Sequence, residues 1–423
     1  MTKPNGFSFV RFWPTIILSV LLISSGYAQT NNQPYSIHAI GDITDNIINR
    51  TSGMGSTGIA YRNNRYIITN NPASLSALDN QFFAGEIGVN GQYIDYSGNG
   101  VSSTNHQSSD ITFKRFSLGT KIFKHWGSAV GLVPYSEENY EYSGTRPIGG
   151  SPAVLPTYDQ GYGGINKVFW ANGYEFLNHF SVGITTSYLF GSITNKNILL
   201  GQGTSIYLSS NNNTFYDHIY LDYGFQYYGS INAHWDFTLG ATFANSQNLR
   251  AETNTNVINL DSNVLRTNTT VSTYNIPTSY GFGFSITRNK KYTLVGDYKY
   301  QNWASQQINT GGYFFENSQR ASIGVEVSNK KVAYNTLYET SFLQAGFYYN
   351  KTYLIVNGTP INDIGGSIGI GVNSKRSVLS LLVVLQYGIK GTTQNNLLRE
   401  NYGNISFIFS MRDFWYTHGR KFD

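Results

Sequence analysis

Large apolar residues alternate with small or polar ones along most of the chain. Residues 280–286 read Tyr-Gly-Phe-Gly-Phe-Ser-Ile, a basic turn follows at 288–291, and residues 292–300 alternate again. Successive side chains of a β-strand point to opposite faces, so each run would have one apolar face and one polar face. Runs of about ten residues with this pattern are typical of strands that cross an outer membrane in a closed barrel, where every backbone group is paired.

Turn-forming positions divide the chain into predicted strands that can be counted. Short connections are predicted at residues 124–125, 178–179, 232–233, 289–290, 329–330 and 374–375. Longer polar stretches occupy about residues 96–108, 137–162, 194–215, 249–274, 304–315, 351–363 and 391–400. Six short turns and seven long loops give thirteen connections, and therefore 14 strands, within residues 81–423. The sequence thus predicts an all-β fold, a 14-stranded antiparallel transmembrane β-barrel with periplasmic turns and extracellular loops.

The second predicted strand contains a change of phase. Ile111 and Phe113 lie on one face, Phe116 and the apolar residues after it lie on the other, and Lys114 and Arg115 separate the two sets. Two polar residues at such a point indicate a β-bulge, which bends a strand and interrupts its pairing. A strand boundary misplaced by one residue would produce the same pattern, so both interpretations stay open here.

Composition supports a barrel and argues against helical membrane spans. The chain is 40% hydrophobic, yet its mean hydropathy is −0.28 and it has no stretch of about 20 apolar residues. Aromatic residues make up 15% and charged residues 13%, whereas a soluble domain carries about 25% charged residues. Amphipathic strands joined by uncharged polar loops account for both values.

The first 28 residues have the features of a secretory signal peptide. Lys3 and Arg11 precede an apolar run over residues 15–23, and the small residues up to Ala28 form a cleavage site. The short apolar core argues against the alternative, a membrane anchor. Removal of residues 1–28 would change the net charge from +5 to +3, and the remaining basic residues are scattered, which does not indicate a nucleic-acid partner. The absence of Cys excludes disulfides and thiolate metal sites.

Residues 29–80 lack the alternation of a strand. Glycines there permit tight turns, and a proline ends an extended stretch. The segment is interpreted either as a periplasmic tail or as a plug (hatch) that folds inside the barrel at its periplasmic end. The candidate plug residues are Gly53, Gly55, Asn71, Pro72 and Ala73. Residues 378–385 are apolar on both faces, which indicates that the lumen beside that strand is filled or lined by apolar groups. Packing of the strand against a plug would explain the same pattern.

This segment resembles the N-terminal hatch of the FadL-type family, the outer-membrane channels for long-chain fatty acids and aromatic hydrocarbons. The matching elements are the Gly-rich stretch at 53–55 and the Asn-Pro-Ala element at 71–73. Later segments resemble the branch of that family found in Bacteroidetes, and these are residues 163–168, 187–191, 297–303, 388–393 and 399–402. The resemblance covers nearly the whole mature chain, and the 14 predicted strands agree with the barrel of the family.

The resemblance implies passive uptake of a hydrophobic small molecule, a long-chain fatty acid or hydrocarbon, across the bacterial outer membrane. Extracellular loops would capture the ligand, and a gap at a kinked strand, here at Lys114 and Arg115, would release it sideways into membrane lipid. The chain would act as a monomer and without a cofactor. No cationic residue can be assigned to a fatty-acid carboxylate, so the expected cargo is hydrophobic compounds in general. The alternative for the same fold is an accessory or shuttle component of type IX protein secretion.

Catalytic patterns in the sequence are weak. Residues 365–369 match the G-x-S-x-G pattern of a nucleophile elbow, but an elbow requires a strand followed by a helix, and here the strand alternation continues. The seven His residues are scattered and form no metal-binding pair. An outer-membrane enzyme is therefore the least favoured alternative, and we expect no catalytic activity and no metal site.

Overall fold

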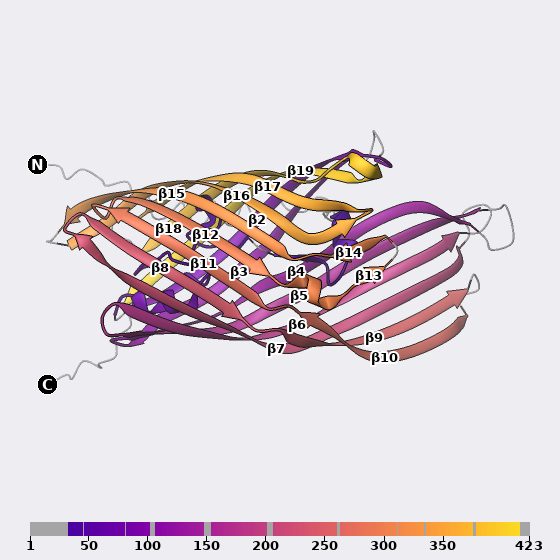
Figure 1. Ribbon diagram of the computed structural model, residues 1–423, viewed down its shortest axis with the longest axis horizontal. Coiled ribbons are helices and arrows are strands. Elements are labelled where there is room, and N and C mark those ends of the chain that lie inside the picture. The colour runs from indigo at the N-terminus through magenta and orange to yellow at the C-terminus, as the bar shows by residue number, and fades with distance from the viewer. Residues whose placement is uncertain are drawn as a thin grey trace, which may run out of the picture.

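Antiparallel strands form a closed barrel in the computed structural model, with its long axis horizontal in Figure 1. The structure describes residues 33–414 except 45, 81, 102–105, 148–153, 201–205, 260–262, 311, 334–335 and 375–377. The predicted signal peptide, residues 1–28, lies outside this part of the chain. Within the described residues, 14 strands form the wall, and β19 pairs with β2 along its whole length to close it. The predicted fold class is confirmed.

The wall strands follow one another around the barrel in chain order, each antiparallel to the next. They are β2 (Phe82–Gly98), β3 (Gln107–Phe123), β4 (Trp126–Pro147), β5 (Val154–Phe176), β6 (Phe180–Leu200), β7 (Ile206–Asn232), β8 (Trp235–Ala244), β9 (Gln247–Asn259), β10 (Val264–Ile276), β11 (Ser279–Arg288), β12 (Tyr292–Gln301), β15 (Ser318–Ala333), β16 (Thr336–Val356), β17 (Thr359–Asn373), β18 (Leu379–Gly391) and β19 (Leu398–Phe414). β8 and β9 both pair with β7, while β11 pairs with β8 and β10 with β9. β8 and β9 together are therefore one interrupted wall strand, and β10 and β11 together are another.

The outer and inner faces of the wall follow the alternation in the sequence. On β8, Leu239 and Phe243 are exposed on the outer surface, whereas the Cα of Gly240 faces the backbone of Ile59 inside the barrel. On β18, Leu385 is exposed outside and its neighbour Val384 is buried. Because side chains alternate strictly in a strand, the apolar outer face and the filled inner face arise from one period-two pattern.

Residues 33–80, here called the N-terminal segment, lie against the inner face of the wall. Its short elements are η2 (Pro34–Ile37), β1 (Asp42–Ile43), η3 (Ser52–Met54) and η4 (Pro72–Ala77). At one end, the hydroxyl of Tyr35 donates to the carbonyl of Leu398, beside the long hairpins; at the other, Asp79 pairs with Arg412 near the short turns. The segment thus extends along the lumen, from the end with the short turns to the end with the long hairpins, which is further than the one end at which it was predicted to fold.

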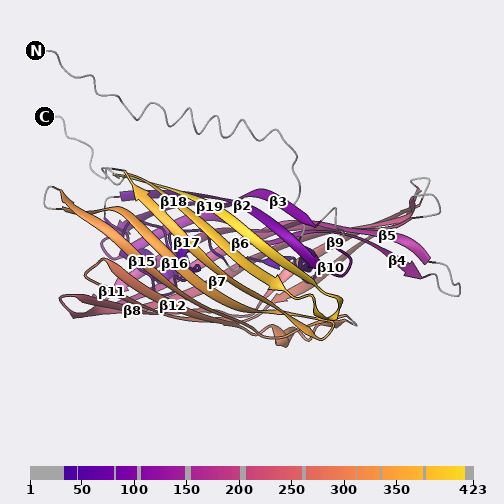
Figure 2. The same ribbon diagram turned by 90° about the horizontal axis from the view of Figure 1, so that it is seen from above.

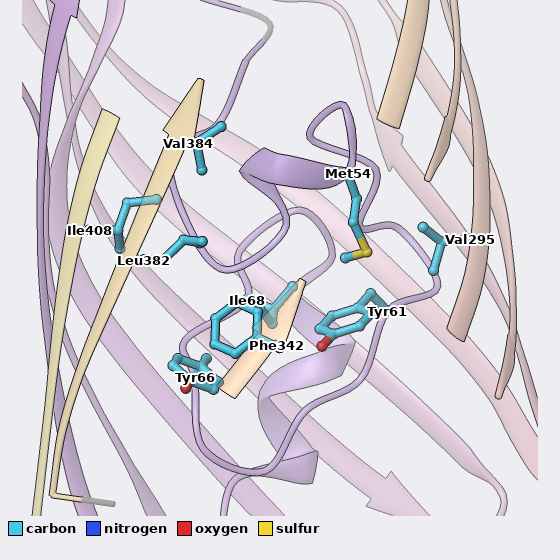
Figure 3. Packing of buried hydrophobic residues seen from close by; sticks show 9 residues of the cluster. All are labelled: Met54, Tyr61, Tyr66, Ile68, Val295, Phe342, Leu382, Val384 and Ile408. Carbon is cyan, nitrogen blue, oxygen red and sulfur yellow. The ribbon is translucent and has the colours of Figure 1, made fainter. Parts of the chain in front are cut away.

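One face of the N-terminal segment forms a dry core with the wall. Figure 3 shows this cluster, in which Met54, Tyr61, Tyr66 and Ile68 of the segment meet Val295, Phe342, Leu382, Val384 and Ile408 of the strands. All nine side chains are buried. The strand that is apolar on both faces, β18, therefore packs its inner side against this segment.

Several stretches predicted as loops are paired strands. Most of residues 137–162, 194–215 and 249–274 belongs to the hairpins β4–β5, β6–β7 and β9–β10, and β4 and β5 project beyond the ends of β2 and β3 in Figure 2. Polar side chains bond across these strands, as in Thr214 with Thr253 (2.8 Å) and Thr255 with Asn212 (2.7 Å). A strand with water on both faces needs no apolar alternation, so the sequence pattern did not reveal it.

One predicted turn is misplaced, and the remaining short elements lie between wall strands. The turn predicted at residues 329–330 is wrong, because β15 and β16 stay paired through Ala333 and Thr336, with only a register shift at Asn329 and Lys330. The short elements are η6 (Trp303–Gln306), β13 (Asn309–Thr310), β14 (Tyr313–Phe315) and η7 (Gln394–Asn396). Among the described helices, none has the length and apolar character needed to span a bilayer.

Candidate functional site: a lumenal cavity beside an opening in the wall

A β-bulge lies at the change of phase in β3. Arg115 pairs with Gly88 and Phe113 pairs with Val89, so Lys114 is an extra residue between two consecutive partners on β2. Both cationic side chains consequently turn inward: Lys114 lines an internal cavity, and Arg115 is only 1% exposed. Phe113 on the other side of the bulge stays on the outer surface, where it is half exposed. The extra residue thus lets two adjacent polar side chains avoid the lipid face.

The wall opens next to this bulge. β3 pairs with β4 only from Phe116, opposite Leu132, to Phe123, opposite Trp126. Over the described residues before Phe116, β3 keeps its pairing with β2 but has no pairing with β4, while β4 continues along β5 to Pro147. A bulge increases the local twist of a strand, which directs this half of β3 away from β4. The opening lies in the half of the barrel away from the short turns.

The N-terminal segment covers the free edge of β4 at the opening. Asp42 and Ile43 of β1 pair with Glu137 and Ser136, and a further backbone bond joins Thr44 N to the carbonyl of residue 135 at 3.0 Å. A single ion pair spans the opening: Lys114 Nζ lies 2.5 and 2.6 Å from the two carboxylate oxygens of Glu137. These contacts satisfy an edge that would otherwise expose unpaired backbone groups.

A cavity of about 230 Å³ lies between the N-terminal segment and the wall, and reaches the opening. Its lining is more apolar than polar, and the apolar part includes Ile43, Ile48, Ile59, Val133, Phe169 and Tyr220. Lys114, Pro134 and Tyr135 line it on the side of the opening. Among the described residues, β1 and the Lys114–Glu137 pair lie at the opening beside this cavity.

Three of the candidate plug residues, Asn71, Pro72 and Ala73, lie at the start of η4, and all three are buried. The side-chain amide of Asn71 donates to the carbonyls of Ile59 and Phe225, at 2.9 and 3.0 Å, and its oxygen accepts from Ala73 N. Pro72 needs no backbone partner at the first helical position. One asparagine thus caps η4 and joins it to β7.

The other two candidate plug residues, Gly53 and Gly55, lie in and after η3. Gly55 has φ of 67°, a left-handed conformation that favours glycine, and its N–H donates to Ser367 Oγ at 2.9 Å. A Cβ on Gly53 would lie 2.6 Å from the side-chain oxygen of Gln344. The Gly-rich stretch is therefore a place of close approach between the segment and β16 and β17.

Glycines of the wall receive η4, and the sequence analysis missed them. A Cβ on Gly127, Gly173 or Gly183 would lie within 2.5 Å of backbone atoms of Leu75, Pro72 or Ala73. These glycines come from three neighbouring strands, β4, β5 and β6. Each is a glycine at an inward-facing strand position, which the sequence alone shows. Which of these glycines meets η4 depends on long-range packing, so the sequence could not identify them.

Arg50 anchors the segment to β15 and β16, and it was also missed. Its guanidinium lies 3.0 Å from Glu326 and 2.9 Å from both carboxylate oxygens of Glu339, and its Cζ lies 3.2 Å from the ring centre of Phe342. Burial lowers the pKa of Arg50, but Glu326, Glu339 and the two nearby tyrosines together outweigh burial and raise that pKa well above its usual value. A bidentate pair of this kind orients both partners.

Arg115 makes a second anchor on the other side of the lumen. Its guanidinium donates to Thr69 Oγ1 and to the carbonyl of Ile67, both at 2.9 Å, and lies 3.3 Å from Glu86. Glu86 in turn accepts from Ile67 N at 2.9 Å. Of the two candidate kink residues, Arg115 therefore holds the N-terminal segment and Lys114 spans the opening.

The serine of the G-x-S-x-G match is a structural residue. Residues 365–369 lie inside the continuous strand β17, and Ser367 Oγ is engaged by Gly55 N. In the part of the chain that the structure describes, no group of three or more His, Asp or Glu is arranged to hold a metal ion. The arrangement therefore consists of a cavity, a cover and an opening.

The barrel resembles solved transport proteins. A FadL homologue from Pseudomonas aeruginosa aligns with a TM-score of 0.62 at 14% identity, covering 89% of this chain and 100% of that one. The toluene transporter TodX of P. putida aligns with a TM-score of 0.57 at 14% identity, covering 87% of this chain and 98% of that one. The toluene transporter TbuX of Ralstonia pickettii aligns with a TM-score of 0.53 at 14% identity, covering 86% of this chain and 97% of that one. At such identities the likeness shows a shared fold, that of an outer-membrane-type FadL-like barrel.

Comparison of the sequence itself shows the family. A search of functionally curated proteins finds no match. The family model of BamG matches residues 12–423, which include every element described above. The chain therefore belongs to the BamG family.

Proposed function

We propose that this protein is a channel of the bacterial outer membrane for the passive uptake of small hydrophobic compounds. The observation that carries the proposal is the junction of a largely apolar cavity with an opening between β3 and β4. A ligand would enter from the side of the long hairpins, occupy the cavity and leave sideways into lipid. One barrel contains all of these parts, so the route needs a single copy of the chain.

A lateral route suits an apolar ligand on energetic grounds. Exposing one methylene group to water costs about 0.8 kcal/mol, so a path through a wet, charged lumen would oppose transport. The lumen on the short-turn side of the cavity holds buried ions such as Arg50 and Glu339, and the N-terminal segment would close it. Release between β3 and β4 avoids that region.

The N-terminal segment would act as the hatch of this channel, with residues 29–80 as the hatch and 81–423 as the barrel. Support comes from its anchors at Arg50 and Arg115 and from its backbone contacts with wall glycines. Its first part, β1, would be the movable cover, because two paired residues join it to β4. Toluene transporters among the structural neighbours add support, since their barrels have the same fold.

The test is to tether β3 to β4 across the opening. The chain has no Cys, so Lys114→Cys with Glu137→Cys gives one unique pair for a short bis-methanethiosulfonate cross-linker, which forms two reducible disulfides and releases methanesulfinate. Uptake of radiolabelled toluene by cells that express the tethered protein should fall by about tenfold and recover after reduction. The matched control is Thr120→Cys with Ser128→Cys, two positions already paired within β3 and β4. Equal uptake by both tethered proteins would contradict lateral release.

A further inference from the structure

Two polar atoms that line the cavity lack a hydrogen-bond partner. They are Arg320 Nη1 and Asp297 Oδ1. Arg320 is only 8% exposed, so Nη1 cannot be satisfied by bulk water. An unpaired buried polar group is unfavourable, and such a group beside a cavity indicates that a bound molecule completes it.

Neither side chain can rotate freely to remove this deficiency, because a second polar atom of each, Arg320 Nη2 and Asp297 Oδ2, is already engaged. Arg320 Nη2 donates to Asn46 Oδ1 at 2.8 Å and to the carbonyl of Gly55 at 2.9 Å. Asp297 Oδ2 accepts from the backbone N–H of Gly58 at 2.6 Å and of Ile59 at 2.9 Å. The N-terminal segment thus orients both groups, and one donor and one acceptor are left over.

The donor and the acceptor are neighbours on one face of the wall. In the pairing of β12 with β15, Asp297 lies opposite Ser322 and Lys299 lies opposite Arg320. Asp297 and Arg320 are therefore diagonal neighbours, within reach of a single small polar group. One of the two groups is acidic and the other basic, so the pair itself does not select an anionic ligand. Lys299 also lines the cavity and has an interaction of its own.

A hydroxyl group matches this arrangement, because its O–H donates while its lone pairs accept. We propose that the cavity binds a small apolar molecule that carries one hydroxyl group, a phenol in the simplest case. The hydroxyl would donate to Asp297 Oδ1 and accept from Arg320 Nη1, and the ring would lie against Ile59. A cavity of about 150 Å³ in another protein holds benzene, so 230 Å³ admits one ring with a substituent.

This inference rests on the proposed function, and it adds the substrate class. The test measures binding of four ligands to the purified protein in detergent, by ligand-detected saturation-transfer NMR with competition. Phenol can donate and accept, anisole can only accept, toluene can do neither, and benzoate carries a charge. Each lost hydrogen bond should weaken binding by about threefold to tenfold, so phenol should bind tightest, then anisole, then toluene.

The variant Asp297→Asn makes the test specific. The amide oxygen must stay where it accepts from Gly58 and Ile59, so the amide nitrogen faces the cavity and the acceptor becomes a donor. The preference for phenol over anisole should then disappear. The matched control, Asp236→Asn, changes a β8 carboxylate that is bonded to Ser230 outside this cavity and should keep the preference.

The outcomes separate this inference from the proposed function. Equal affinity for phenol, anisole and toluene would overturn the hydroxyl assignment and show that water satisfies the two atoms, while the tethering result would still stand. Tightest binding of benzoate would assign an anion site instead and also overturn it. If none of the four ligands binds to folded protein, both the inference and the proposed channel fail.

Discussion

Two parts of the N-terminal segment, the region around η3 and β1, are held by contacts of very different strength. Around η3, Arg50 is enclosed with Glu326 and Glu339, whose side chains are 5% and 7% exposed, and glycines bring the backbones together. At the opening, β1 is joined to β4 at two residues and to β18 by the partly exposed Asp42–Lys390 ion pair, and the Lys114–Glu137 pair is 13% and 29% exposed. Buried, bidentate pairs cannot be broken cheaply, whereas partly solvated pairs can. The comparison indicates a static inner hatch and a cover that can move.

Removal of Arg50 should have the largest effect. Arg50→Ala leaves Glu326 and Glu339 buried without their cation, which should cost about 3–5 kcal/mol and detach the segment. Urea unfolding in detergent and protease cleavage within the segment measure both effects. The matched control is Arg250→Ala, whose ion pair with Asp217 is exposed and should contribute at most about 1 kcal/mol. Similar losses in both variants would remove the distinction between the two kinds of contact.

A methyl group on an inward-facing wall glycine should have the next largest effect. A Cβ on Gly127 would lie 1.9 Å from the carbonyl oxygen of Leu75, so Gly127→Ala should destabilise the protein by about 1–3 kcal/mol. Gly403→Ala in β19 is the control, because no atom lies within 4 Å of its added Cβ, and it should be neutral or slightly stabilising. The measurement is the urea concentration at the unfolding midpoint, compared between wild type and each variant. If Gly127→Ala unfolds at the wild-type midpoint, η4 does not pack against β4 as described.

Breaking the ion pair across the opening should have the smallest effect on stability and a clear effect on transport. Lys114→Gln or Glu137→Gln should change the free energy of unfolding by less than about 1 kcal/mol, because both side chains are partly solvated. The initial rate of toluene uptake should rise severalfold, since the cover is held less firmly. Exchanging the two charges in one double variant should restore the wild-type rate. Rates below wild type in both single variants would mean that the pair guides the ligand and does not restrain the cover.

Local patterns in the sequence were enough to predict the wall. Alternation is set by neighbouring residues, so the lipid-facing side chains, the number of strands and the phase change at Lys114 were visible without the structure. The polar hairpins were missed because a strand with water on both faces, such as residues 249–259, has no apolar period. There, Thr and Asn side chains bond between neighbouring strands, both within the β9–β10 hairpin and from β9 to β7.

Most of the site was beyond the sequence, because it depends on contacts between distant residues. Gly55 and Asn71 belong to visible motifs, but their partners on β17 and β7 lie more than 150 positions away. Arg50, Asp297 and Arg320 carry no local pattern at all. Their roles arise only when the N-terminal segment packs against the wall, and a contact between distant residues leaves no periodic pattern in the sequence.

The most direct test of the account is to trace the ligand inside the barrel. A photoreactive phenyl azide, activated by light during uptake, attaches to the residues along its path, and mass spectrometry of the recovered protein identifies them. Labels at the opening are expected, on Val133 and Tyr135 of β4 and on Ile43 of β1. Labels concentrated on Arg62 and Asn63, at the short-turn end of the lumen, would show axial passage past the hatch and contradict lateral release.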